Sequence, residues 1–532
     1  MKENKDDNIV RMLAMGQYDA PQKQMQPIFR LDPYRSNIAV FGAPMSGKTT
    51  FIKTLLVRLH ENMDQVPGEN IYIIDFGGNI GAYGKLRNVC ACFDNSNEEN
   101  IKRVFRTIEK RLEENAKQLD SQNYYSVVSK TPEKAPTHLF LIIENVNAFL
   151  ADERYASYQD RLTRFCRDGL TKGLTVVITA NETSGVNRLL SNFGQKVAFE
   201  VSNESYYDIF NTKVNKPMKL PGRGIVNVNS ETYEFQCFLP FPTTDDEESI
   251  KKLIEQTKKY PNKNILAAFS GDLTWDNIEE YCTREQLDQC SDDQVIVGLD
   301  YYEHKPIVVD IEKSRAIAIY GKRNFGITNL VSVLLKGIKK SRPDARFIYL
   351  DDGRKKLEKF YKPGSYHISD DAVYFLEADN LKEYLVENGY ILPNTDASRQ
   401  LPQSLDAPFT VFVIRSRMVF KGSTGMGVKL LKNSFPSMIG DAVARRLMFI
   451  FADVPSISEH DTQRIFSDNM DTAFLLDNIG EFMADKSDKT PFGTMDAMQL
   501  KADYAKCAVG DGYFYNVASD DLQKLKFVKV VE

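Results

Sequence analysis

The sequence predicts an α/β protein made of two tandem modules, each a mostly parallel sheet flanked by helices. Two observations support this prediction: apolar strands alternate with helical segments, and one ordered series of landmarks occurs twice in the 532 residues. An apolar strand at 37–41 runs into a glycine-bounded loop and then into a helix. A second strand, loop and helix of the same pattern start at residue 317, which indicates an internal duplication.

Each landmark of the first module has a counterpart about 270 to 290 residues later, at the spacing expected of a repeat. The first module has predicted strands at 37–41, 71–78, 137–143, 174–181 and 196–201, and a hairpin-like pair that opens at 221–226. Their counterparts lie at 317–320, 347–353, 409–414, 447–453, 472–476 and 510–514. Charged helices are predicted at 97–119 and 153–169. We expect a loose lead-in with a short helix at 1–30, a first module at 31–240, a helical linker at 241–293 and a second module at 294–532.

The composition disfavours strong overall attraction to nucleic acid, as well as zinc sites, disulfides and membrane-spanning segments. The net charge of −5 gives no strong overall field for DNA or anionic lipid. Seven scattered cysteines and five distant histidines make zinc and disulfide sites poor hypotheses and favour a reducing compartment. We see no signal peptide at the start, and no apolar run approaches the ~20 residues that span a bilayer.

The loop after the first strand has the spacing of a phosphate-binding loop, G-x-x-x-x-G-K-T. Its residues are Gly42, Ala43, Pro44, Met45, Ser46, Gly47, Lys48, Thr49 and Thr50. Backbone amides of such a loop and the following helix N-terminus point at phosphate oxygens. The charge of Lys48 serves the β and γ phosphates of ATP, and the hydroxyl of Thr49 serves Mg²⁺. The pattern therefore predicts a RecA-like P-loop NTPase module.

The third predicted strand ends in Glu144 and Asn145, where a P-loop NTPase carries its acidic residues. Glu144 is predicted to orient the Mg²⁺ shell together with Thr49. The next position usually holds a glutamate that polarises the attacking water, and an amide cannot accept that proton. We therefore predict that Lys48, Glu144 and Asn145 form a site that binds Mg-ATP well and hydrolyses it slowly.

The second copy has lost the charges of this site. Ile327 stands in place of the lysine, and Arg415 and Ser416 stand at the acidic position. Losing one charge-assisted phosphate contact costs about 2.7–4 kcal/mol by analogy with an oxyanion donor. Lys322 and Arg323 are candidates for partial compensation. We predict a hydrolytically inactive module that binds a peptide or another subunit.

The sequence gives weaker evidence for a functional role of basic residues outside the two loops. Arg161, Arg164 and Arg167 lie on the helix before the fourth strand, where a ring ATPase can place an arginine that reaches a neighbour's γ phosphate. A solvated helix face is the alternative. The pairs 251–252 and 339–340 are interpreted as solvated lysines.

The tandem arrangement resembles the FtsK/SpoIIIE class of P-loop motor ATPases. More closely, it resembles the C-terminal half of the EssC-type ATPase of Gram-positive type VII secretion systems. The residues that carry this lie at 38–50, 71–78, 167–169, 221–224, 234–236 and 297–300. The resemblance extends over about residues 30 to 532. It implies a cytoplasmic motor subunit, peripheral to or part of a membrane complex, that engages WXG-type secreted substrates.

The resemblance also implies binding partners, and two alternative functions stay open beside it. Such proteins carry transmembrane helices and a further ATPase module upstream, so the chain is either a fragment or a separately encoded half that docks on a membrane-embedded secretion core. Self-association as a hexamer or ring is expected, and a substrate export signal would bind the last module. A DNA translocase or conjugation coupling ATPase is one alternative, which the charge and Asn145 disfavour. A non-enzymatic scaffold is the other.

Overall fold

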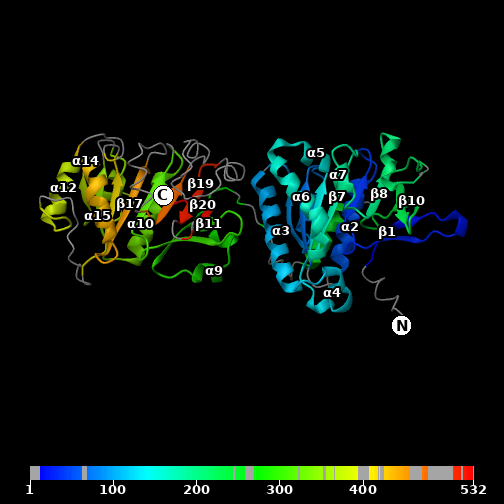
Figure 1. Cartoon of the computed structure of the whole chain (residues 1–532), viewed down its shortest axis with the longest axis horizontal. Coiled ribbons are helices and arrows are strands. Elements are labelled where there is room, and N and C mark those ends of the chain that lie inside the picture. Colours follow the sequence, from blue (N-terminus) through cyan, green and yellow to red (C-terminus); the bar gives the residue numbers. More distant parts are fainter. Residues whose placement is uncertain are drawn as a thin grey trace. The chain divides into compact units, whose positions relative to one another are not determined.

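A computed structural model of the chain forms two compact units, residues Met1–Ala268 and Phe269–Glu532 (Figure 1). The structure describes residues 12–530 except 63–68, 97, 213, 215, 244–245, 258–265, 267–268, 270, 322–323, 352–354, 365, 394–406, 417–418, 420–424, 455–469, 477–506, 517–518 and 520. Among these residues, no helix is both long and apolar enough to cross a bilayer.

The first unit contains a mixed ten-stranded sheet in the order β2-β1-β10-β9-β8-β3-β7-β6-β4-β5. Strands from β8 to β5 pair in parallel, and those from β2 to β8 pair antiparallel. The strands are β1 (Leu13–Tyr18), β2 (Ile28–Leu31), β3 (Ile38–Phe41), β4 (Glu69–Asp75), β5 (Val89–Phe93), β6 (His138–Glu144), β7 (Leu174–Ala180), β8 (Gln195–Phe199), β9 (Arg223–Val228) and β10 (Glu231–Cys237). The central strands β3, β4, β6 and β7 are buried throughout, as their continuous apolar sequences predict.

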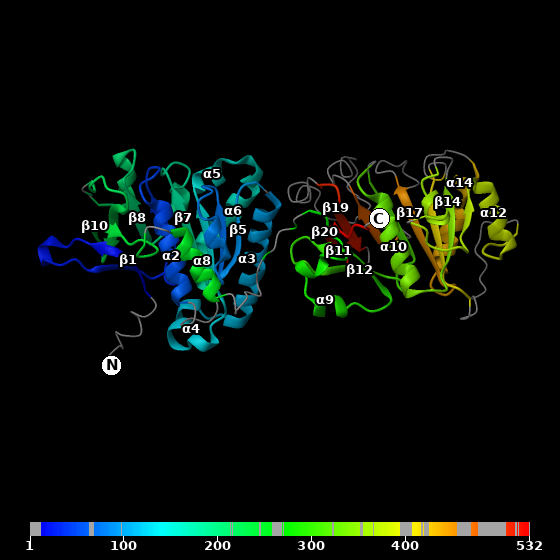
Figure 2. The ribbon, with the colours of Figure 1, turned by 180° about the vertical axis from the view of Figure 1, so that it is seen from behind.

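Helices cover both faces of this sheet and form two cores. One core lies under α3, α5 and α6 (Figure 1) and the other under α2 and α8 (Figure 2). The helices are α2 (Lys48–Asn62), α3 (Glu98–Leu119), α4 (Tyr124–Lys130), α5 (Val146–Ala151), α6 (Ala156–Asp168), α7 (Asn187–Leu190) and α8 (Asp246–Thr257). The predicted α/β class is confirmed, with the P-loop strand β3 near the centre of the sheet.

The second unit repeats this topology strand for strand, in the order β12-β11-β20-β19-β18-β13-β17-β16-β14-β15. Its strands are β11 (Gln294–Asp300), β12 (Pro306–Asp310), β13 (Ala316–Tyr320), β14 (Arg346–Asp351), β15 (Val373–Phe375), β16 (Thr410–Arg415), β17 (Leu447–Val454), β18 (Thr472–Leu475), β19 (Asp511–Asn516) and β20 (Asp521–Phe527). Its helices are α9 (Arg284–Asp288), α10 (Ile327–Ser341), α11 (Glu358–Tyr361), α12 (Ala378–Glu387), α14 (Met426–Lys429) and α15 (Phe435–Gly440). The two sheets therefore confirm the tandem architecture.

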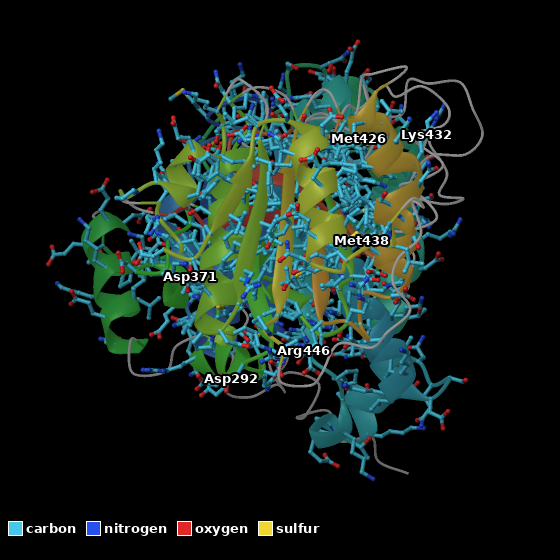
Figure 3. All side chains as sticks on the ribbon, turned by 90° about the vertical axis from the view of Figure 1, so that its left-hand side faces the viewer. Asp292, Asp371, Met426, Lys432, Met438 and Arg446 are labelled. Carbon is cyan, nitrogen blue, oxygen red and sulfur yellow. The ribbon has the colours of Figure 1, made fainter. Side chains whose placement is uncertain are left out.

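The two faces of the second sheet are also covered by different helices. Helix α10 packs over one face (Figure 2), while α12, α14 and α15 cover the other. Met426 and Met438 lie on the helical stretch that runs beside the strands (Figure 3), and Met438 is fully buried in that core.

Within residues 12–30, the structure contains the expected short helix, a 3₁₀ turn at Pro21–Lys23, but corrects the expectation of a loose lead-in. Residues Leu13–Tyr18 form β1, which pairs antiparallel with β10, and Ile28–Leu31 form β2 beside β1. Leu13 and Met15 are buried in the core under α2. β10, which joins β1 to the rest of the sheet, lies more than 200 residues away in the sequence, so local composition did not reveal this pairing.

The expected linker at 241–293 also divides between the two units. Ile250 of α8 is buried in the core of the first unit. Leu273, Ile278 and Cys282 pack against Leu299 and Val528 in the second unit. Both helical segments are thus parts of the modules, and the boundary between units falls at residues 268 and 269.

Candidate functional site

The predicted phosphate loop of the first module connects the end of β3 with the start of α2. Met45 and Gly47 have positive φ angles of 64° and 118°, which turn the backbone around the loop. A Cβ at Gly47 would lie 2.9 Å from the Cα of Gly222, so only glycine fits there. The amide of Gly222 donates to the carbonyl of Ser46 at 3.0 Å. The turn before β9 therefore supports the loop from outside.

Lys48 lies at the N-terminus of α2 with its ammonium turned onto the loop. Its Nζ donates to the carbonyl oxygens of Gly42 at 2.6 Å and Ala43 at 2.8 Å. Burial lowers the pKa of Lys48 to about 8, although the charge of Glu144 opposes this shift. A phosphate group near the loop offers this cation stronger partners than two neutral carbonyls.

Thr49, near the start of α2, contacts Glu144 at the end of β6. The Thr49 hydroxyl donates to Glu144 Oε1 at 2.5 Å. Asp75, at the end of β4, lies in register with Glu144 and accepts hydrogen bonds from the amides of Gly77, Gly78 and Ile80. Asp75 therefore organises the turn after β4, while Glu144 remains directed at the P-loop.

The second carboxylate oxygen of Glu144 is suited to bind a cation. Glu144 Oε2 is buried and accepts no hydrogen bond from the described residues. Burial, aided by the carboxyl of Asp75, raises the pKa of Glu144 to about 7, against the effects of Thr49 and Lys48. A buried carboxylate beside a threonine hydroxyl provides hard oxygen ligands of the kind that Mg²⁺ takes beside nucleotide phosphates.

A cavity of about 220 Å³ opens over this loop. Of the predicted residues, it is lined by Met45, Gly47, Lys48, Thr49 and Thr50. Gly42, Ala43, Pro44 and Ser46 shape the loop instead: the amides of Gly42 and Ala43 donate to the carbonyls of Ala180 and Glu200. Sequence reasoning missed the other wall, which consists of Pro221, Gly222, Gln236, Cys237 and Leu239. The sequence predicted a hairpin-like pair opening at 221–226 but did not assign it to the cavity.

Asn145 follows Glu144 directly and is the N-cap residue of α5. Its φ of 59° places it in the left-handed region, which asparagine tolerates better than most residues. The backbone N–H of Asn145 donates a hydrogen bond to the hydroxyl of Thr179, near the end of β7, at 2.8 Å. The fold thus brings Lys48, Thr49, Glu144 and Asn145 to one edge of the sheet.

From residue 324 onward, the loop of the second module keeps the turn of the first but carries different side chains. Asn324 and Gly326 have φ angles of 72° and 102°, close to those of Met45 and Gly47. Ile327 packs in the core beside the pocket and presents an apolar side chain where the first module has its lysine. Lys322 and Arg323, the expected compensating cations, lie outside the described residues.

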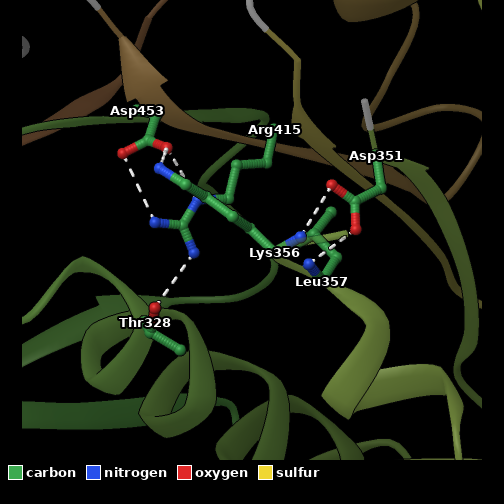
Figure 4. Close-up of polar contacts among 6 residues, drawn as sticks. All are labelled: Thr328, Asp351, Lys356, Leu357, Arg415 and Asp453. Atoms are coloured by element: carbon green, nitrogen blue, oxygen red, sulfur yellow. Dashed lines mark hydrogen bonds and ion pairs between the residues drawn. The ribbon is translucent and has the colours of Figure 1, made fainter. Parts of the chain in front are cut away.

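Arg415 occupies the acidic position of the second module and binds the threonine of its loop (Figure 4). Its Nη1 donates to Thr328 Oγ1 at 3.0 Å, as Thr49 contacts Glu144 in the first module. Its Nε and Nη2 donate to the carboxylate of Asp453 at 3.0 and 3.4 Å. The side chain is 6% exposed, so the guanidinium is held in a fixed position.

Asp453 is a residue that sequence reasoning missed. It lies near the end of β17, where it also binds Lys356 Nζ at 2.8 Å. Burial alone would raise the pKa of Asp453, but hydrogen bonds and charges from Arg415 and Lys356 keep it below its ordinary value. The available signal was a carboxylate at the end of a strand next to the one that ends in Arg415. Asp351 does not face the loop threonine, because it accepts from the amides of Lys356 and Leu357.

The three arginines of α6 contact carboxylates of their own unit. Arg161 and Arg164 lie 3.6 and 3.9 Å from Glu109 of α3, and Arg167 binds Asp168 at 2.8 Å. Arg164 and Arg167 are both 61% exposed. Their contact with a neighbouring subunit stays a prediction.

The family of the first module follows from a comparison with known families. Residues 17–198, which include the P-loop and the strand ending at Glu144, match the model of the FtsK/SpoIIIE family. Over these residues the first module is similar to FtsK/SpoIIIE domains. This is a family of ATPases, which bind nucleotides, and the matched residues include the loop that lines the cavity over Lys48.

The FtsK/SpoIIIE domain and the module after it are similar to type VII secretion proteins. The type VII secretion system protein EssC of Staphylococcus aureus is 22% identical over 321 residues, 57% of this chain and 21% of that protein. The ESX secretion system protein EccC of Geobacillus thermodenitrificans is 23% identical over 434 residues, 77% of this chain and 28% of that protein. The chain thus spans about a quarter of the length of these relatives.

Solved structures show that the whole chain has the fold of two such ATPase modules. EssC (ATPases 2 and 3) from Geobacillus thermodenitrificans superimposes with a TM-score of 0.71 at 19% identity, covering 98% of this chain and 96% of that one. Thermomonospora curvata EccC (ATPases 2 and 3) in complex with a signal sequence peptide gives 0.62 at 17% identity, covering 98% and 94%.

Proposed function

We propose that this chain is the ATP-binding motor part of a type VII protein secretion system, located in the cytoplasm and docked on a membrane-embedded core. The observation that carries the proposal is the match of both modules, in order, to EssC ATPases 2 and 3. The relatives named for secretion cover up to 77% of this chain, whereas the family model alone covers residues 17–198. A shared fold alone does not settle function, so the proposal needs a test.

In this proposal the first module binds Mg-ATP and hydrolyses it slowly. The P-loop amides and Lys48 hold the phosphates, and Thr49 and Glu144 hold Mg²⁺, which would neutralise phosphate charge. Asn145 stands where a water-activating carboxylate is usual and has no basic group at neutral pH. Slow turnover follows because the attacking water keeps its proton.

Replacing Asn145 with glutamate should accelerate ATP turnover at saturating Mg-ATP by roughly tenfold or more, because a general base typically contributes 10²–10⁴-fold. Glutamate is less tolerant of the left-handed backbone at φ 59°, with a cost of about 1–2 kcal/mol. Asn145→Gln is the matched control, since it has the same length and backbone cost without the carboxylate. A glutamate variant no faster than the glutamine variant in phosphate release would count against this role.

The second module would bind the WXG-type substrate or a partner. Deleting residues from 269 onward should abolish capture of a purified WXG-type helical hairpin from the same organism. The cut belongs at 269 rather than near 300, because Leu273 and Ile278 pack with Leu299 and Val528 and a later cut leaves them exposed. Retained capture by residues 1–268 would place recognition in the first module.

The same preparations test the secretion assignment itself. The full chain should bind the hairpin protein and show no salt-dependent binding to duplex DNA, because phosphate contacts release counterions and give a steep salt dependence. Strong salt-dependent DNA binding without hairpin capture would instead support a DNA translocase. ATP binding without any turnover, even with membrane partners present, would support a scaffold.

A further inference from the structure

The pocket of the second module is built differently from a magnesium nucleotide site. It is a cavity of about 540 Å³ lined by Asn324, Gly326, Ile327, Thr328, Lys356, Lys359, Arg415 and Asp453. This volume is within the range of cavities that hold small ligands. Three of the lining residues are cationic and one is a carboxylate, so the lining has an excess of positive charge.

The described part of the loop, from Asn324 to the start of α10, keeps a backbone geometry that suits an anion. The loop still turns through positive φ at Asn324 and Gly326 and still opens α10, a helix of 15 residues. The first amides of a helix have no partners within it and carry the positive end of the helix dipole. The loss of the lysine at Ile327 therefore removes one charge but leaves the turn at 324–326 and the helix N-terminus.

Arg415 supplies a fixed cation at the point where the first module would take a metal. The threonine hydroxyl that would serve Mg²⁺ accepts from the guanidinium at 3.0 Å instead (Figure 4). Asp453 holds the other side of the guanidinium, and Lys356 shares that carboxylate. A divalent cation next to Arg415 would be repelled, so this pocket favours anions that arrive without metal.

A second cationic side chain, Lys359 of α11, also lines this cavity. Lys359 of α11 lies with its ammonium 3.8 Å from the centroid of the Tyr366 ring. The ring positions the ammonium by a cation–π contact while leaving it on the cavity wall. Two elements, β16 and α11, thus direct positive charge toward one P-loop-like turn.

We propose that the second pocket is a metal-independent site for a phosphate chain, in which Arg415 takes the place of Mg²⁺ and Lys359 the place of the P-loop lysine. The ligand chemistry is that of linked phosphates, either as a free polyphosphate or as the phosphates of a nucleotide. Neither hydrolysis nor substrate capture enters this inference, so it succeeds or fails apart from the proposed function.

The test uses the full chain with Lys48→Ala, which silences the first site, in excess EDTA. Titration with inorganic tripolyphosphate should give binding by calorimetry, and amide hydrogen exchange should slow at residues 324–330 rather than 42–50. Adding Mg²⁺ should weaken this binding, because the metal competes for the ligand. Binding that requires Mg²⁺, protection confined to 42–50, or no binding of either tripolyphosphate or ATP would overturn the proposal.

Two variants and a control test whether the charges of Arg415 and Lys359 bind the phosphates. Lys359→Ala and Arg415→Ala should each weaken tripolyphosphate binding roughly tenfold or more, the size expected for a charged hydrogen bond. Lys336→Ala is the control, because Lys336 also lies over Tyr366, at 5.7 Å, but does not line the cavity. Lys359→Ala keeps the test valid if Arg415→Ala folds poorly. Unchanged affinity in Lys359→Ala would overturn the proposal.

The source of the phosphates is decided by comparing ligands in EDTA. Equal affinity for tripolyphosphate and ATP supports a site for the phosphate chain alone. Tighter binding of ATP supports a nucleotide held without metal.

Discussion

Replacing Lys48 with alanine should weaken Mg-ATP binding by roughly 100-fold or more, because one charge-assisted contact to phosphate is worth about 2.7–4 kcal/mol by analogy with an oxyanion donor. The wild-type chain should bind Mg-ATP at one site per chain in calorimetry, since only the first module pairs a P-loop lysine with a carboxylate at Thr49. The second module presents Ile327 and Arg415 at the equivalent positions.

A matched control lies one turn further along the same helix. Lys53 of α2 lies 3.8 Å from Asp246 and over the ring of Tyr83, away from the loop. Lys53→Ala should leave the affinity for Mg-ATP unchanged. Two sites of similar affinity for Mg-ATP, or full binding in Lys48→Ala, would contradict the division of roles between the modules.

Replacing Arg415 with alanine should destabilise the second unit by about 3 kcal/mol, since breaking a buried ion pair typically costs 3–5 kcal/mol and Lys356 remains as a partner for Asp453. The single tryptophan of the chain, Trp275, lies in this unit. Its fluorescence during denaturant unfolding therefore follows the second unit alone. The midpoint should fall markedly compared with the wild-type chain.

The control for this prediction is another arginine of the same unit. Arg284 lies 3.9 Å from Glu279 with both side chains mostly exposed. Arg284→Ala should change stability by no more than about 0.5 kcal/mol. The double variant Arg415→Ala/Asp453→Ala should be more stable than the sum of the single changes predicts, because it leaves no unpaired carboxylate. Additive losses would show that the pair is not coupled.

Much of the fold was predictable because the signals are local and repeated. Continuous apolar strands at Ile38–Phe41 and Ala316–Tyr320, each followed by a glycine loop and a helix, predict buried parallel strands in both modules. The P-loop residues were predictable for the same reason, since their spacing is set by backbone geometry. Strands β1 and β2 were not, because β1 joins the sheet by pairing with β10, a segment remote in sequence, and β2 is held at the sheet edge only by pairing with β1.

The sequence alone determined the duplicated α/β architecture, the phosphate loop at Lys48 and the loss of the lysine and the acid from its second copy. These features depend on residue order within short segments, where hydrophobic periodicity and glycine spacing act directly. Only the tertiary structure decided that Arg415 binds both Thr328 and Asp453. Those three residues lie on α10, β16 and β17, and parallel pairing of β16 with β17 brings their ends together across almost 40 residues of sequence.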